Sequence, residues 1–423
     1  MNLLLRHVKI FDPSSPFHQQ TADIFVQDGI IRSIGNNIEV SAEHTIDGAT
    51  LTASPGWVDL FAHFPDPGFE YKETIASGSA AAAAGGFTDV LLLPNTVPVV
   101  HHKSAVEYIV QRSKYLPVTL HPIGAVTKNA EGKELAEMYD MHQSGAIAFG
   151  DGNNSIQSAG MVLKALQYIK AIGKTLIQVA DDKSISAHGL MNEGIVSTRL
   201  GLPGKPAIAE EAMISRDIEL TRYTDSSIHF TGVSTAKGID LVRLAKAEGL
   251  NVSCSVTPYH LYYCDEDLIE YDSNLKVNPP LRTGFDRDEL RRGVIDGTVD
   301  CIASHHAPHE KDSKIVEFEY AREGMIGLQT SFAVVRSILP GLNLERLIEM
   351  FCTNARSLFH LPAASIQEGQ SACISMFASD EKWMFKEQQN RSRSFNSPFF
   401  GKEFTGKPKG IINKDKVFLT DQL

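Results

Sequence analysis

Cysteine is scarce in this 423-residue chain, and the spacing of its few cysteines excludes two common uses of the residue. Their number is odd, they lie far apart and no two form a CxxC pair; the five are Cys254, Cys264, Cys301, Cys352 and Cys373. Such spacing predicts neither a disulfide framework nor a thiolate zinc site. We therefore expect reduced thiols and a cytoplasmic location.

Long apolar runs and an excess of basic residues are also absent. No run of about 18 apolar residues occurs, and the start, MNLLLRHVKIFDP, soon reaches charge and proline, so neither a membrane span nor a signal peptide is predicted. The 40 Lys and Arg against 51 Asp and Glu give a net charge of −11, which argues against a nucleic-acid partner. The sequence contains no GxxxxGK[ST], GxSxG or HExxH motif, which excludes the phosphate loop, nucleophile elbow and zinc-protease helix that these motifs form.

Both ends of the chain are predicted to form strands. With 43% hydrophobic and 22% charged residues the composition is that of a globular protein, and the length suits one large domain with a smaller one. The first 54 residues alternate apolar and polar positions around turn residues such as Asp28-Gly29. After about residue 355, strand-like patterns return at 372–378 and 409–419. We expect residues 1–54 and 356–423 to build one composite β domain.

The middle of the chain, residues 55–355, is predicted to form a barrel. Short apolar runs alternate there with helical stretches, as in parallel strands that are buried on both faces. Eight such runs indicate a TIM (β/α)8 barrel, whose reactive groups lie at the C-terminal ends of the strands. The runs are 56–61, 87–94, 120–126, 146–151, 175–180, 227–234, 251–258 and 300–308.

Several segments next to these runs carry a resemblance to a known family. They include DLFAHFPDPGFEYKETI (59–75), LKVNPPLRT (275–283) and ASHHAPHEKDSK (303–314). Over nearly its whole length the chain resembles dihydroorotases of the amidohydrolase superfamily. This resemblance implies a barrel with a small β-sandwich domain built from both chain ends. It also implies a metal centre made of a His-x-His on strand one, an Asp on strand four, histidines on strands five and six, and a catalytic Asp on strand eight.

The sequence departs from that pattern at four of the six metal-ligand positions. Phe61, Val179 and Gly232 stand where the family has histidines, and His305 stands where it has the catalytic Asp. Pro65 replaces the arginine that grips the substrate carboxylate in the family. We therefore expect no catalytic residue, and a mouth that is partly apolar.

Two metal-ligand positions are kept, as His63 and Asp151. Three ligands and a water can hold a catalytic zinc, so His63, Asp151 and His305 could form a vestigial one-metal site. The preferred alternative is that no metal is bound and that His63 and Asp151 form a hydrogen-bonded pair. His305 and His306 are neighbours on one strand and should point to opposite sides, so they do not form a metal clamp.

Three other positions, Asn95, Asn278 and His309, match residues that contact dihydroorotate in the family. By that match they are substrate-binding residues. An equally weighted alternative is that they are loop residues that satisfy backbone groups and shape turns.

The resemblance leads to three alternative functions. The first is an inactive, structural protein of pyrimidine biosynthesis, a pseudoenzyme that supports the assembly of aspartate transcarbamoylase and itself forms a homodimer. The second is an active cyclic-amide hydrolase, similar to dihydroorotases, hydantoinases or allantoinases, with a remodelled or single-metal site. The third is a sensor that binds dihydroorotate or carbamoyl aspartate without turnover.

Overall fold

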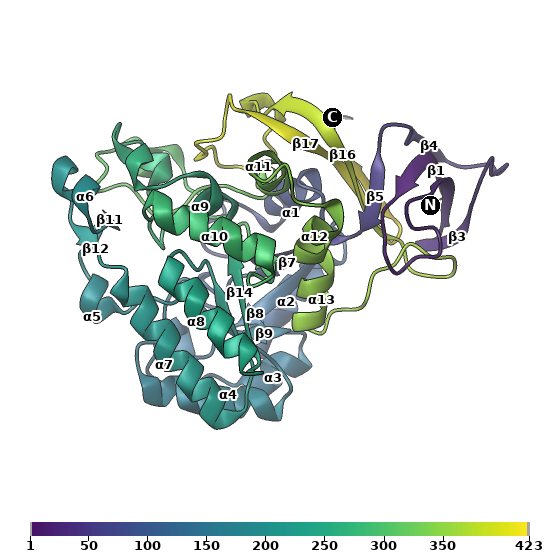
Figure 1. The fold of residues 1–423 in the computed structure, drawn as a ribbon. Coiled ribbons are helices and arrows are strands. Elements are labelled where there is room, and N and C mark those ends of the chain that lie inside the picture. The colour runs from purple at the N-terminus through teal and green to yellow at the C-terminus, as the bar shows by residue number, and fades with distance from the viewer. Residues whose placement is uncertain (1, 421–423) are drawn as a thin grey trace.

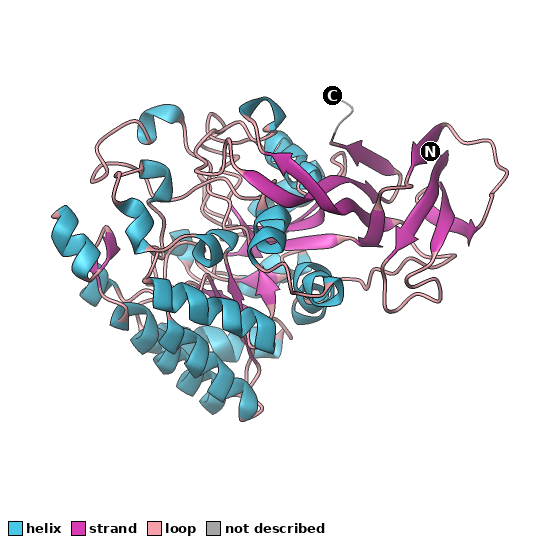
Figure 2. Ribbon diagram, turned by 45° about the horizontal axis from the view of Figure 1, so that its top comes forward, coloured by secondary structure: helices cyan, strands magenta, loops and turns pink. Residues whose placement is uncertain are grey.

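The computed structural model describes residues 2–420, so the outermost ends of the predicted composite domain, residue 1 and residues 421–423, lie outside it. Helices gather around a central set of strands, and a second group of strands extends to one side (Figures 1 and 2). Both ends of the chain lie on the side of that second group (Figure 1). None of the helices within residues 2–420 is long and apolar enough to cross a membrane.

The central strands form the predicted barrel. All eight are parallel and pair in chain order, and a bridge between Ala62 and His306 joins the first strand to the segment after the last. Each apolar run of the sequence supplies one strand, which confirms the TIM-barrel prediction. The strands are β6 (Trp57–Ala62), β7 (Phe87–Leu92), β8 (Thr119–Gly124), β9 (Ala148–Phe149), β10 (Leu176–Gln178), β13 (Ile228–Thr231), β14 (Val252–Val256) and β15 (Cys301–Ile302).

Helices cover the outside of the barrel, and several of them begin at capping residues. Thr74, Thr235 and Thr283 each accept a backbone hydrogen bond at the start of a helix, as threonine does at N-caps. The helices are α1 (Ile75–Ala84), α2 (Lys103–Ser113), α3 (Met138–Gln143), α4 (Ala159–Ala171), α7 (Ile208–Thr224), α8 (Ala236–Ala247), α9 (Pro258–Tyr262), α10 (Gly284–Asp296), α11 (Ser331–Ile338), α12 (Leu344–Ile348) and α13 (Asn354–Leu358).

Short elements fill the loops between strands and helices. The connection from β10 to α7 contains α5 (Lys183–Ser186), β11 (Met191–Asn192), α6 (Ile195–Leu200) and β12 (Gly204–Lys205), and its two strands pair with each other. Single helical turns are η1 (Lys128–Ala130), η2 (Asp265–Leu268), η3 (Ser273–Leu275), η4 (Lys311–Ser313) and η6 (Glu387–Gln389), and η5 (Glu349–Thr353) is a π-helical turn.

The second group of strands is a single sheet made from both ends of the chain, here called the chain-end sheet. β5 pairs antiparallel with β16, which joins the N-terminal strands to the C-terminal ones. Asp28 and Gly29 have φ values of 50° and 76°, the backbone that a tight hairpin needs, and they connect two of its strands as predicted. The strands are β1 (Asn2–Ile10), β2 (Thr21–Gln27), β3 (Ile30–Gly35), β4 (His44–Asp47), β5 (Thr52–Pro55), β16 (Cys373–Met384), β17 (Glu403–Asn413) and β18 (Lys416–Leu419).

Candidate functional site at the barrel mouth

A cavity of about 230 Å³ opens at the C-terminal ends of the barrel strands, where this fold places its reactive groups. We call it the mouth cavity. Its lining is mixed, with apolar side chains from strands one, two and five beside polar ones from the loops. The lining residues are Phe61, Leu93, Asn153, Asn154, Val179, Lys183, Tyr259, Asn278, His305, His306, Ala307, Glu323 and Gly324.

Two neighbouring rings, tilted against each other, occupy one wall of the mouth cavity. The rings of Phe61 and His305 lie 4.4 Å apart between centroids, with an angle of 33° between their planes. His305 is buried, and its Nε2 lies 2.8 Å from the Thr231 hydroxyl. Burial lowers the pKa of His305 to about 3, so the ring is neutral at physiological pH. The position where the family carries a charged catalytic carboxylate therefore holds an uncharged ring.

The His305 ring also takes the space above Gly232. A Cβ atom built on Gly232 would lie 2.5 Å from Cε1 of His305, far inside van der Waals contact. The φ of Gly232 is +70°, which side chains rarely adopt. A histidine at position 232 could not coexist with the present His305.

A chain of polar groups inside the barrel holds His305 in place. The Ser255 hydroxyl donates to Thr231 Oγ1 over 2.9 Å, and His229 Nε2 lies 3.0 Å from the Ser255 hydroxyl. His229 Nδ1 lies 2.8 Å from the hydroxyl of Ser253. Burial lowers the pKa of His229 to about 3. These polar groups are buried and hydrogen-bonded to one another, which fixes the orientation of the His229 and His305 rings.

His63 and Asp151 do not contact each other through their side chains, so the expected pair is wrong. His63 Nε2 donates to the Asn95 carbonyl over 2.9 Å. Both Asp151 carboxylate oxygens accept from Thr127, one from its N–H at 2.9 Å and one from its hydroxyl at 2.5 Å. Asn95 connects the two residues instead, because its Nδ2 donates to the Asp151 carbonyl over 3.1 Å. Each side chain has a nearer partner on the adjacent loop, Asn95 for His63 and Thr127 for Asp151.

These donors do not fit a zinc ion. Zinc takes four ligands with free electron pairs, and His63, whose Nε2 donates to a carbonyl, has only Nδ1 left as a ligand, while both Asp151 oxygens already accept from Thr127. His305 lies against Phe61 and bonds Thr231. Within residues 2–420 no group of three or more His, Cys, Asp or Glu side chains is placed to hold a metal. His63, Asp151 and His305 are thus not assembled into the metal site that the sequence suggested.

The three residues that match substrate contacts of the family are also not brought together. Asn278 lines the mouth cavity, where its Oδ1 accepts from Lys205 Nζ over 2.6 Å. Asn95 is absent from the lining, and its side chain bonds the backbone of residues 151 and 153, as the loop-shaping alternative expects. His309 lines a neighbouring cavity, with Nε2 donating to the Glu323 carbonyl over 2.9 Å.

Known proteins resemble the chain in sequence and in fold. A family model described as "Dihydro-orotase-like" matches residues 51–238. The dihydroorotase of Pelotomaculum thermopropionicum is 38% identical over 427 residues and covers 100% of both chains, and that of Ruminiclostridium cellulolyticum is 39% identical with 97% of each covered. The chain belongs to the dihydroorotase family. An L-hydantoinase (dihydropyrimidinase) from Arthrobacter aurescens has a TM-score of 0.84 at 25% identity, covering 98% of this chain and 95% of its own.

Membership of the dihydroorotase family makes the chain a dihydroorotase- and hydantoinase-like cyclic amidohydrolase in sequence and architecture. Its mouth contains residues that the motif comparison did not single out. Lys183 is the first residue of α5, five positions after the end of β10, so its place in the loop after a barrel strand is a usable signal. The sequence gives no signal for Lys205, because its partners, Asn278 and, at 2.7 Å, Asp181, lie far from it along the chain. Only the folded chain brings these together.

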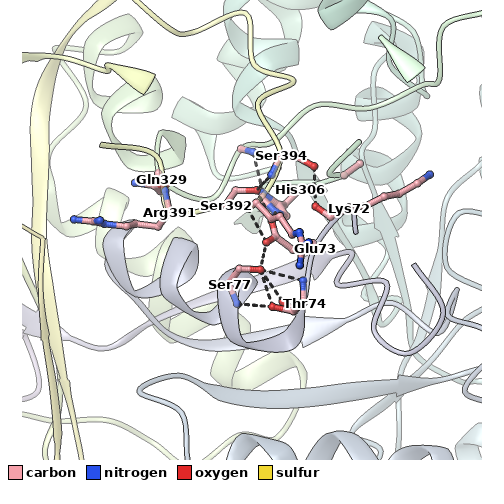
Figure 3. Close-up of polar contacts among 12 residues, drawn as sticks. Lys72, Glu73, Thr74, Ser77, His306, Gln329, Arg391, Ser392 and Ser394 are labelled. Carbon is pink, nitrogen blue, oxygen red and sulfur yellow. Dashed lines mark hydrogen bonds and ion pairs between the residues drawn. The ribbon is translucent and has the colours of Figure 1, made fainter. Parts of the chain in front are cut away.

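His305 and His306 lie beyond the end of β15, where His305 has a φ of 44°, so the period of a regular strand does not apply to them. Both line the mouth cavity, against the expectation that they point to opposite sides, and His306 also bonds a buried carboxylate (Figure 3). Its Nε2 lies 3.3 Å from Glu73 Oε2. Glu73 also accepts from the hydroxyls of Ser77 and Ser392 and, over 2.9 Å, from the Arg393 N–H. The last two belong to residues 385–402, the crossing segment that connects β16 to β17. Glu73 therefore fastens a C-terminal segment to the first loop of the barrel.

Removing this carboxylate should destabilise the protein strongly. We expect Glu73→Ala to lower the free energy of unfolding by about 3 kcal/mol, because several buried donors lose their acceptor. Glu134→Ala, which removes an exposed carboxylate that pairs with Lys128, should change it by less than about 0.5 kcal/mol. Urea unfolding of both variants measures the difference. Equal, small effects would show that water replaces Glu73 without cost.

Proposed function

We propose that this dihydroorotase-family chain is a non-catalytic protein of pyrimidine biosynthesis that supports the assembly of aspartate transcarbamoylase. The observation that carries the proposal is the Phe61–His305 ring contact, which puts two uncharged rings where the family resemblance expects metal ligands. Hydrolysis of an amide by the family needs a metal-bound hydroxide, and within residues 2–420 no group of three or more His, Cys, Asp or Glu side chains is placed to hold a metal.

Conservation of the architecture supports a structural role. The chain aligns over its full length with dihydroorotases and superposes on a hydantoinase with a TM-score of 0.84. A barrel that keeps its whole framework while its mouth changes still presents the outer surface by which a family member could hold a partner. The partner itself is proposed from the family resemblance.

The experiment is co-expression with the aspartate transcarbamoylase of the same organism, followed by a sizing column and sedimentation. We expect one complex that contains both chains, whereas the chain alone should sediment as a homodimer. Phe61→Ala alters the mouth only and should leave the complex intact, because an assembly role does not use the cavity. Two separately eluting species would contradict the proposal.

The second candidate is a hydrolase of cyclic amides with a remodelled site. It is favoured by the mouth cavity, which remains open at about 230 Å³ and keeps Asn278 in its lining. A binder without turnover would use the same space. Dihydroorotate should then raise the melting temperature of the chain, since a ligand that binds the native state stabilises it. An unchanged melting temperature removes both alternatives.

A further inference from the structure

A second cavity, of about 610 Å³, lies beside the mouth cavity and is here called the side cavity. His309 forms part of its wall and bonds the carbonyl of Glu323, which lines the mouth. The loops after β6, β14 and β15 and the crossing segment together surround it. Its lining residues are Tyr71, Ser273, Asn274, His309, Glu310, Lys311, Lys314, Ile315, Glu387, Arg393, Ser394, Phe395 and Asn396.

Hydrogen bonds fix the walls of the side cavity. The Arg393 N–H is held by Glu73, and the Ser394 hydroxyl donates to the Lys72 carbonyl over 2.7 Å (Figure 3). Asn396 Nδ2 donates to the Ala307 carbonyl over 2.9 Å, so the crossing segment is tied to the loop after β15 as well. A ligand therefore meets a formed pocket and does not have to order it.

Cationic side chains without partners face this cavity. Lys311 and Arg393 have no side-chain hydrogen bond or ion pair to any residue within 2–420. Lys314 is buried and donates to the carbonyls of Arg322 and Gly324, over 2.7 and 3.0 Å. Glu310, one of the two acidic residues of the lining, lies 3.6 Å from Lys72 Nζ. Burial lowers the pKa of Lys314 to about 7, so the positive charge at the cavity comes chiefly from Lys72, Lys311 and Arg393, against the carboxylates of Glu310 and Glu387. Lys311 and Arg393 are the charges left to attract an anion.

Large rings border the same cavity. Tyr71 and Phe395 are 53% and 55% exposed, although both are side chains that gain from burial. A guanidinium recognises phosphate through two parallel hydrogen bonds, and aromatic side chains stack on flat heterocycles. A pocket with both cations and exposed rings suits a ligand that carries a phosphate and a flat heterocycle.

We propose that the side cavity binds a small phosphate monoester that carries a flat ring, of the size and class of a nucleoside monophosphate. The volume lies within the roughly 300–1,000 Å³ of ligand pockets. Arg393 and Lys311 bind the phosphate, and Phe395 and Tyr71 cover the ring. The site is separate from the mouth and does not depend on the proposed assembly function.

Calorimetric titration of the full chain with AMP at pH 7.5 tests the proposal. We expect one binding site per chain, and about tenfold weaker binding in each of Arg393→Gln, Lys311→Gln and Phe395→Ala. Lys164→Gln removes an exposed lysine of α4 and is the matched charge control, with unchanged affinity. All four side chains are exposed, so the melting temperatures of the variants should equal that of the parent chain.

Two further titrations separate the parts of the ligand. Inorganic phosphate and adenosine should each bind at least about tenfold more weakly than AMP, because each meets only half of the site. Phosphate that binds as tightly as AMP would overturn the proposal, since the rings would then contribute nothing. Absence of heat at millimolar AMP, or equal affinities of Arg393→Gln and Lys164→Gln, would also overturn it.

Discussion

Protein purified without chelator and incubated with excess zinc should retain well under one equivalent of the metal after desalting. Its hydrolysis of dihydroorotate should be at least about 10⁴-fold slower than that of a zinc-loaded family member, because zinc lowers the pKa of its bound water from about 15.7 to about 7. Without that shift, water in the mouth cavity is a poor nucleophile. Elemental analysis and an assay in both reaction directions provide the two measurements.

A variant with the family's ligands supplies the positive control. Phe61→His, Val179→His, Gly232→His and His305→Asp together restore every ligand position and should raise the zinc content. Gly232→His alone should instead destabilise the protein, since its Cβ would lie 2.5 Å from the His305 ring. Zinc near one or two equivalents in the parent chain, with turnover, would contradict the expectation and favour the hydrolase.

The free energy of unfolding should fall steeply as the pH is lowered from about 6.5 to 5. Burial lowers the pKa of His229 and His305 to about 3 and that of His260 to about 4, whereas the unfolded chain titrates them near 6.5. Their contribution is therefore complete above pH 6.5 and is lost as the pH falls, by about 2 kcal/mol each at pH 5. Asp151 acts in the opposite sense, because burial raises its pKa to about 6, and it regains only about 1 kcal/mol over this range.

Urea unfolding between pH 5 and 8 measures this dependence. His229→Gln should reduce the slope by about 1.4 kcal/mol per pH unit, the contribution of one proton. His188→Gln removes an exposed histidine and should leave the slope unchanged. A flat profile above pH 5 would show that these rings are hydrated or already charged in the folded protein.

The framework of the protein follows from local pattern, and much of the mouth does not. Apolar runs located all eight barrel strands. The period of two along a strand does not describe His305 and His306, because both lie beyond β15 and both line the mouth cavity. The partner of His63 could not be found in this way, because the Asn95 carbonyl is no more distinctive in sequence than any other carbonyl. Likewise, His305 has a φ of 44° and packs against Phe61, and both facts depend on a contact between the first and last strands.

The crossing segment was missed for a related reason. Its apolar residues follow neither the period of a helix nor that of a strand, and nothing in the sequence indicates that Ser392 and Arg393 bond Glu73. The Glu73 carboxylate indicates a contact with another segment only once its burial is known, and the sequence does not show that burial. Contacts that span more than 300 positions of the chain are set by the fold as a whole.

The Glu73 contact also determines the order in which the molecule can be completed on the ribosome. When the eighth barrel strand has emerged, about 90 residues remain to be translated before Ser392 and Arg393, two of the four partners of Glu73, exist. Until then water must supply the missing hydrogen bonds of the carboxylate, so the loop after the first strand stays hydrated. A nascent chain halted before residue 392 would keep that side of its barrel open to solvent and proteases, because the crossing segment covers the first loop.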